Sequence, residues 1–266
     1  MSLEGPVPVR SVERRVTMAE TARIEAAVAA AESVLAARYP DADFAFAAGS
    51  IIRGQGTPHS DIDLVVMYGR IDRARRESFR SGGFPIEAFV HDPETLRWFM
   101  DQDVARGRPV ILTMVAEGRL IGPVTAGAEA SRAEATGLLA KGPPPLSAKR
   151  RNALRYEITD LVDDLRDRRP PPEMLAIGAA LHQRLADLML LGRGRWTGSG
   201  KWIPRLLAAL DESLGRDFDE AFRRLFADGR ADLLIALAEA ELRRHGGPLF
   251  AGDRREAPAD ARRPSG

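Results

Sequence analysis

Hydrophobic residues recur at helical spacing near the start of the chain. Within the alanine-rich residues 17–39, the apolar positions are Ile24, Val28, Ala31, Val34 and Leu35. Steps of three and four residues are typical of one face of an α-helix. Pro40 and the acidic residues around it predict the end of this helix. Residues 1–17 mix proline, arginine and valine without a period, and we expect them to be frayed.

Shorter apolar runs further along predict the strands of a sheet. Residues 44–48 indicate a short buried strand that leads into a Gly-Ser pair. Residues 62–68 are apolar enough to lie at the centre of the sheet. Residues 78–91 contain a third strand, with Gly82-Gly83 as a turn.

Two more elements complete the first half of the chain. Asp92, followed by proline and glutamate, predicts the start of a helix over residues 95–105. We expect residues 110–121 to form a hairpin that turns at Glu117-Gly118.

The second half has a different pattern. The Gly-Pro-Pro-Pro run at residues 142–145 predicts a stiff, extended linker. Residues 147–245 are helical in pattern, beginning with a helix over about 148–168 and continuing with two or three more. The last 16 residues are charged, small and proline-bearing, and we expect them to be disordered.

These patterns predict an α/β (α+β) fold. A small mixed-sheet domain over residues 18–141 is followed by an all-α helical-bundle domain over residues 147–250. With 266 residues, 44% of them hydrophobic, the chain is long enough for two modest cores.

Composition excludes several classes of function. Lysine plus arginine number 39 and aspartate plus glutamate 38, so nucleic acid is not an expected partner. The absence of cysteine excludes disulfides and thiolate metal sites. No apolar run approaches the roughly 20 residues that span a bilayer, and no signal-peptide core is present. We therefore expect a cytoplasmic protein without a membrane partner.

Two aspartates indicate a metal site. Asp61 and Asp63 are two residues apart at the start of a predicted strand, so their carboxylates project from the same face. Two adjacent carboxylates repel each other, and a divalent cation such as Mg²⁺ compensates them well. An Asp-x-Asp pair alone is common, and its usual interpretation is a solvated turn.

The Gly-Ser pair before the aspartates has the character of a phosphate-binding turn. Gly49 permits a close approach of the backbone, and the hydroxyls of Ser50 and Ser60 can bind phosphate. Arg53, one turn later, can neutralise charge on a leaving group.

A third acid stands in an otherwise apolar strand. An unpaired carboxylate inside a sheet is costly, so Glu87 needs a partner. Sharing metal with Asp61 and Asp63 would supply one, and three carboxylates could hold two ions. The alternative is a surface acid on an edge strand.

These motifs resemble the signature of the polymerase-beta-like nucleotidyltransferase superfamily. Residues 49–53, 60–63 and 86–92 carry the resemblance, and residues 49 to about 123 are similar to kanamycin-type aminoglycoside nucleotidyltransferases. The resemblance implies transfer of a nucleoside monophosphate from a triphosphate, expected to be ATP, to a hydroxyl of a small molecule, with release of pyrophosphate. Mg²⁺ is the implied cofactor, and a homodimer is compatible with the resemblance.

Acidic residues of the second domain are candidates for acceptor binding. Four of them share one helix face, namely Glu157, Asp160, Asp164 and Asp167. They would suit a cationic acceptor such as an aminoglycoside, and Asp164 or Asp160 is our choice for a general base. The alternative is a solvated face paired with arginines, namely Arg151, Arg155, Arg166 and Arg168.

A second candidate lies between two tryptophans. In residues 195–202, a Gly-Ser-Gly-Lys run separates Trp196 from Trp202. The rings could stack on a base while Lys201 reaches phosphate. Alternatively, the tryptophans simply pack between helices.

Two other functions remain open. The protein could adenylylate another protein, as nucleotidyltransferases of toxin–antitoxin pairs do, or bind a nucleotide without turnover. Intact Asp61, Asp63 and Glu87 argue against the second of these.

Overall fold

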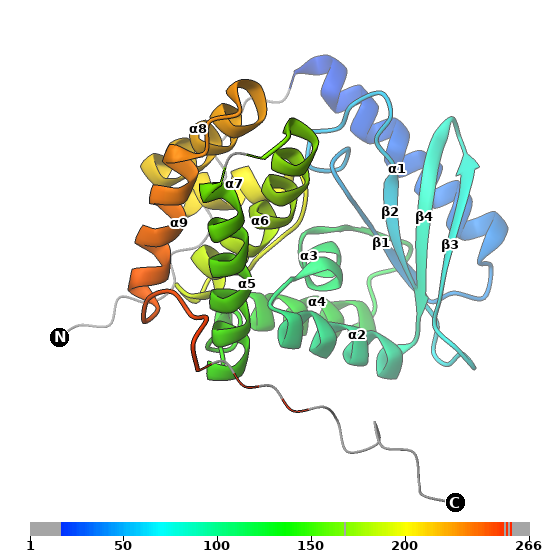
Figure 1. Cartoon of the computed structure of the whole chain (residues 1–266). Helices are drawn as coiled ribbons and strands as arrows, with labels where there is room; N and C mark the ends of the chain where they lie inside the picture. The colour runs from blue at the N-terminus through cyan, green and yellow to red at the C-terminus, as the bar shows by residue number, and fades with distance from the viewer. Residues whose placement is uncertain (1–16, 168, 253, 255, 257–266) are drawn as a thin grey trace, which may run out of the picture. The chain divides into compact units, whose positions relative to one another are not determined.

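The computed structural model describes residues 17–167, 169–252, 254 and 256 (Figure 1). The expectations of a frayed start and a disordered end fall largely on residues outside this set. The chain divides into two compact units, Met1–Pro144 and Pro145–Gly266. The predicted domain limits, residues 18–141 and 147–250, lie within these units, and the limits themselves stay a prediction.

The first unit is built on a five-stranded mixed sheet. Its strands are β1 (Phe44–Ala48), β2 (Ile62–Met67), β3 (Arg75–Ser81), β4 (Phe84–His91) and β5 (Arg119–Ile121). They lie in the order β3-β4-β2-β1-β5. Only β2 and β4 run parallel, and the other neighbours are antiparallel. The Gly82-Gly83 turn is confirmed, because it joins β3 to β4.

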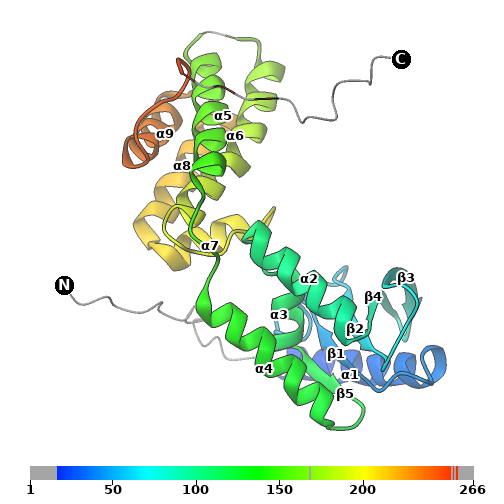
Figure 2. The same ribbon diagram turned by 90° about the horizontal axis from the view of Figure 1, so that it is seen from below.

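Helices cover both faces of this sheet. They are α1 (Met18–Arg38), α2 (Pro93–Arg106), α3 (Val110–Glu117) and α4 (Ala126–Lys141). Helix α1 begins with a Thr17–Glu20 capping box and buries its apolar side against one sheet face. Helix α2 contacts β4, and α3 contacts β1 and β2. Figures 1 and 2 show α1 and α2 on opposite sides of the strands.

The hairpin predicted over residues 110–121 is wrong. Residues Val110–Glu117 form α3, and only Arg119–Ile121 form a strand, which pairs with β1. A short apolar run fits either a strand or a buried helix, and packing decides between them. Here Ile111, Leu112 and Val115 lie on one buried helix face. The Asp103 carboxylate accepts from the Leu112 backbone N–H at 3.1 Å and so caps this helix from α2.

The second unit is all-helical, as predicted. It contains α5 (Ala148–Arg166), α6 (Pro171–Leu191), α7 (Trp202–Leu210), α8 (Glu212–Asp228) and α9 (Asp232–Arg244). Four helices therefore follow the first in the described part of the unit, where two or three were expected, and Arg168 lies outside the described residues. The fold class, a mixed-sheet unit followed by a helical one, is confirmed.

Helix α6 is the most apolar helix of the second unit. By length and composition alone, it is the one described helix that could cross a membrane. Its Leu181, Leu185 and Leu188 are buried in the core that all five helices share. A helix at the centre of a bundle has the same composition.

Candidate active site

Three carboxylates converge at one end of the sheet. Strands β2 and β4 are parallel neighbours, and their register pairs Asp63 with Glu87. Paired residues of neighbouring strands project from the same face. Asp61 lies just before β2, and one carboxylate oxygen from each of the three residues lies within 4.8 Å of the other two. The structure therefore brings together the three residues predicted to bind metal.

The spacing of these oxygens fits a magnesium ion after a small adjustment. Octahedral Mg²⁺ holds oxygens at about 2.1 Å, so two of its ligands lie at most about 4.2 Å apart. The separation of up to 4.8 Å can close by rotation of the side chains, which are exposed at Asp61 and half-buried at Asp63 and Glu87. The three residues can thus hold a metal ion.

A basic side chain also reaches this acidic group. The Arg76 guanidinium lies 3.0 Å from Oε1 of Glu87 and is 63% exposed. An ion pair this open to water is weak, typically about 0–1 kcal/mol. Sequence reasoning missed Arg76. The alternation of β3, which places residues 76, 78 and 80 on one face, is the signal that could have found it.

The Gly-Ser turn abuts the carboxylates. Gly49 follows β1 with φ +99°, and a Cβ added there would lie 2.8 Å from Oδ2 of Asp63. Only glycine fits both this backbone conformation and this space. The Gly49 carbonyl accepts from the Arg53 N–H at 3.3 Å, so Arg53 lies one turn after Gly49, as predicted.

The two serines predicted to bind phosphate lie against each other. Ser50, only 7% exposed, donates from Oγ to Oγ of Ser60 at 3.0 Å. The same Ser60 oxygen accepts from the Thr57 N–H at 2.9 Å. The Arg53 guanidinium lies 4.0 Å from Oε2 of Glu117, the last residue of α3. The hydrogen bond thus joins Ser50, which follows Gly49, to Ser60, which precedes the carboxylate residue Asp61.

An arginine on α1 fixes the loop between these serines. Arg23 donates to the Thr57 carbonyl at 2.7 Å, and its guanidinium lies over the Phe84 ring at 5.8 Å. No local motif marks Arg23 for this role, because its contacts are to residues more than 30 positions away.

The other predicted residues belong to the second unit. Asp160 is exposed on α5, and Asp164 pairs with Arg169. Glu157 pairs with Arg184 at 3.3 Å. Arginines therefore compensate part of this acidic face, as the alternative interpretation expected, but with different partners.

Lys201 is exposed and immediately precedes α7. The loop before it is anchored to α6, since buried Thr197 donates to Asp187 at 2.5 Å. Trp196 and Trp202 are both partly buried. This burial favours a packing role over two rings held open for a base.

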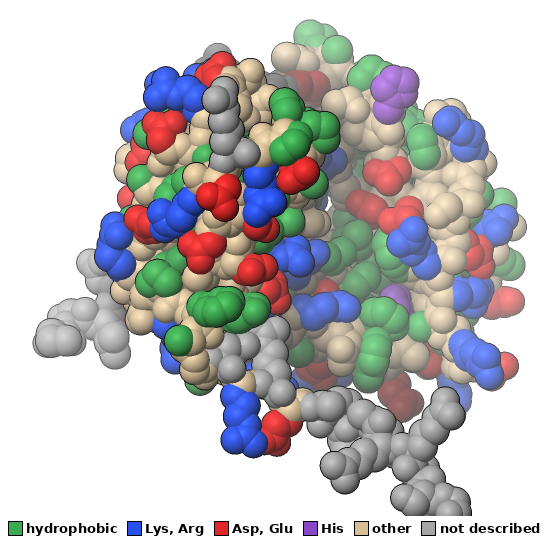
Figure 3. Space-filling model, viewed as in Figure 1, with side chains coloured by type: hydrophobic (Ala, Val, Ile, Leu, Met, Phe, Trp, Pro, Cys, Tyr) green, Lys and Arg blue, Asp and Glu red, His purple; other side chains and the backbone are tan. Residues whose placement is uncertain are grey.

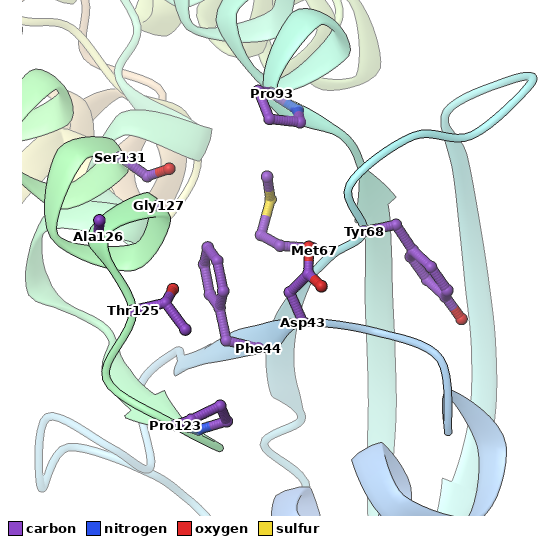
Figure 4. A pocket seen from close by; sticks show the side chains of 10 residues that line it. All are labelled: Asp43, Phe44, Met67, Tyr68, Pro93, Pro123, Thr125, Ala126, Gly127 and Ser131. Carbon is purple, nitrogen blue, oxygen red and sulfur yellow. The ribbon is translucent and has the colours of Figure 1, made fainter.

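A separate pocket of about 480 Å³ opens at the other end of the sheet (Figure 4). It includes Asp43 and Phe44 at the start of β1 and Met67 at the end of β2, whereas Gly49 follows the end of β1. Asp43 is the one carboxylate among its lining residues, so the chemistry of three clustered acids is not repeated there.

Comparisons with known proteins add little. No protein-family model matches the chain, and no curated protein matches it. Among solved structures, it is similar to a nucleotidyltransferase-like protein from Exiguobacterium sibiricum 255-15, at 13% identity and a TM-score of 0.43. That match covers 82% of this chain and 73% of the other. Because this identity and this TM-score are low, the similarity carries no functional argument, and the proposal below rests on the site residues.

Proposed function

We propose that this protein is a metal-dependent nucleotidyltransferase. It would transfer a nucleoside monophosphate from a nucleoside triphosphate, preferably ATP, to a hydroxyl group. One observation carries this proposal: the carboxylates of Asp61, Asp63 and Glu87 converge beside the Gly49-Ser50 turn. This combination supplies metal ligands and a phosphate-binding backbone in one place.

Each part has a distinct role in the proposal. The three carboxylates would hold Mg²⁺, which when bound would stabilise negative charge on the phosphates. The Gly49 backbone would approach the β- and γ-phosphates closely, and the Ser50 and Ser60 hydroxyls, which bond to each other in the structure, would turn to donate to them. Arg53 compensates charge on the departing pyrophosphate.

The reaction is a single displacement. The acceptor oxygen forms a bond to the α-phosphorus while the bond to the bridging oxygen breaks, and that oxygen leaves with the electron pair as part of pyrophosphate. The hydroxyl proton passes to the Oε atom of Glu87 that does not bind the metal, and Asp160 or Asp164 of the second unit is the alternative base. Most of the rate gain comes from positioning and charge compensation.

The acceptor is proposed to be a small molecule. A cationic, aminoglycoside-like acceptor was favoured by the acidic face of α5, yet Glu157 and Asp164 each pair with an arginine there. Those pairs weaken the support for a cation. A protein acceptor is the main rival, and tagged ATP added to a cell lysate separates the two by labelling either a protein band or a small molecule.

Neutralising one metal ligand tests the activity. Asp63→Asn should lower magnesium-dependent pyrophosphate release from ATP by about 100-fold or more, a typical cost of losing transition-state charge stabilisation. Asp72→Asn, at an exposed acid in the loop after β2, is the matched control and should keep full activity. Retention of turnover by Asp63→Asn in a folded protein would refute the proposal.

A further inference from the structure

Strand β3 borders the carboxylates on the side away from the Gly-Ser turn. Its register places Ser78 opposite Glu87, Arg76 opposite Phe89 and Arg80 opposite Pro85. Residues paired in this way share a sheet face. Arg76, Ser78 and Arg80 therefore lie on the same sheet face as Glu87.

A row of paired residues crosses the sheet from the end of β1, next to the Gly-Ser turn, to β3 at the edge of the sheet. The registers pair Ala48 with Asp63, Asp63 with Glu87, and Glu87 with Ser78. Neighbouring strands are about 4.8 Å apart, so Ser78 is roughly as close to Glu87 as Asp63 is. Gly49-Ser50, after β1, and Ser78, on β3, thus flank the metal ligands from opposite sides.

In-line displacement then fixes the direction of the acceptor. This step rests on the proposed function, which places pyrophosphate at the Gly-Ser turn. The attacking and leaving oxygens lie on opposite sides of the α-phosphorus. The acceptor must therefore approach from the side of β4 and β3.

That side carries positive charge. Arg76 and Arg80 are both exposed, and Arg76 reaches Glu87 at 3.0 Å. A metal ion bound by Glu87 would compete with Arg76 for this carboxylate and so free the guanidinium to bind another anion. The neighbouring acid, Glu77, belongs to the other face of the sheet, where it contacts Arg75 at 2.7 Å and also Arg38 and Tyr39.

We propose that β3 forms the acceptor side of the site, where Arg76 and Arg80 bind an anionic group on the hydroxyl-bearing acceptor. Guanidinium groups bind phosphate and carboxylate with charge-assisted hydrogen bonds. The Ser78 hydroxyl adds a donor between the two arginines. The substrate class is therefore a hydroxylated phosphate or carboxylate rather than a polycation.

Anion binding to the loaded full-length protein tests this assignment. With Mg²⁺ and a non-hydrolysable ATP analogue occupying the phosphate side, inorganic phosphate and acetate are titrated separately by calorimetry. The Arg76→Met/Arg80→Met double variant should bind the preferred anion at least about tenfold more weakly than the wild type. Arg75→Met, which changes the opposite face of β3, should bind it like the wild type. Whichever anion binds more tightly identifies the group recognised.

The result separates this inference from the proposed function. If Mg²⁺ and the ATP analogue bind, but the double variant and the wild type bind the anion equally or not at all, the acceptor assignment is overturned and the proposed activity stands. If the analogue fails to bind in the presence of Mg²⁺, both are overturned.

Discussion

At the scale of single residues, Gly49 combines a positive φ with a close approach to a carboxylate of the metal site. Gly49→Ala should weaken Mn²⁺ binding by about tenfold and lower stability by about 1–3 kcal/mol. The new methyl would lie 2.8 Å from Oδ2 of Asp63 and displace a metal ligand. Titration with Mn²⁺ and thermal melting measure the two effects.

Gly83 supplies the matched control for this substitution. It also has a positive φ, +82°, but a Cβ there meets nothing within 4 Å. Gly83→Ala should therefore lose stability through backbone strain alone and keep its affinity for Mn²⁺. Equal loss of Mn²⁺ affinity in both variants would contradict a specific contact between Gly49 and the metal site.

The Arg76–Glu87 ion pair makes a second prediction at this scale. In the absence of nucleotide, Arg76→Met should raise the affinity for Mn²⁺ about two- to fivefold, because an exposed ion pair of about 0.5–1 kcal/mol no longer competes with the metal. Arg75→Met, whose partner is Glu77, should leave the affinity unchanged. Unaltered Mn²⁺ affinity in Arg76→Met would mean that this pair does not oppose metal binding.

At the scale of elements, helix α3 depends on a carboxylate from outside itself. Its N-cap residue, Pro109, has no side chain that can accept a hydrogen bond. The carboxylate of Asp103, only 1% exposed, accepts from the Leu112 N–H instead. Burial raises the pKa of Asp103, although hydrogen bonds from Leu112 and Ile111 partly oppose the shift. Asp103 therefore holds its proton to a higher pH in the folded state than in the unfolded chain.

The sign of that shift sets a pH dependence. A carboxyl group whose pKa is raised by folding contributes stability below its unfolded pKa of about 3.9, and this contribution is lost as the pH rises through the folded pKa. Asp103→Asn cannot ionise, so its stability relative to the wild type should improve as the pH rises above about 4. Urea unfolding at several pH values measures this trend, and a flat difference would contradict it.

Asp103→Ala separates the cap from the charge. It leaves the Leu112 N–H without its acceptor, so at every pH it should be about 1–3 kcal/mol less stable than Asp103→Asn, which also cannot ionise. A loss in Asp103→Asn as large as the loss in Asp103→Ala would show that the amide oxygen cannot replace the carboxylate as a cap.

The sequence predicted the features that depend on neighbouring residues and missed those that depend on distant contacts. Local signals predicted the Gly82-Gly83 turn and the start of α2 at Asp92, because turn and capping chemistry act over a few residues. The spacing of Asp61 and Asp63 predicted their shared face for the same reason. Helix α3 was missed because its cap, Asp103, precedes it by seven or more residues, and Arg76 because its contact with Glu87 depends on strand register.

At the scale of the whole molecule, charge is balanced rather than segregated. The chain carries 39 basic and 38 acidic residues, and on the face in Figure 3 the two kinds are interspersed. In the second unit many of them are paired, for example Arg193 with buried Glu241 at 2.6 Å. Broad electrostatic attraction to a polyanion is therefore not expected, and selection of an acceptor falls to local groups such as Arg76 and Arg80.

The two units have separate cores, which leads to the last prediction. One core combines α1 with the sheet, the other combines α5 to α9, and none of the described residues belongs to both. The boundary falls at Pro144-Pro145, within the proline run. Residues 17–144 expressed alone should therefore fold cooperatively and bind Mn²⁺ with the affinity of the full chain, because all three carboxylates lie in this unit. Asp63→Asn in this fragment is the control and should abolish binding. A fragment that folds but has lost its affinity for Mn²⁺ would mean that the second unit contributes to the metal site.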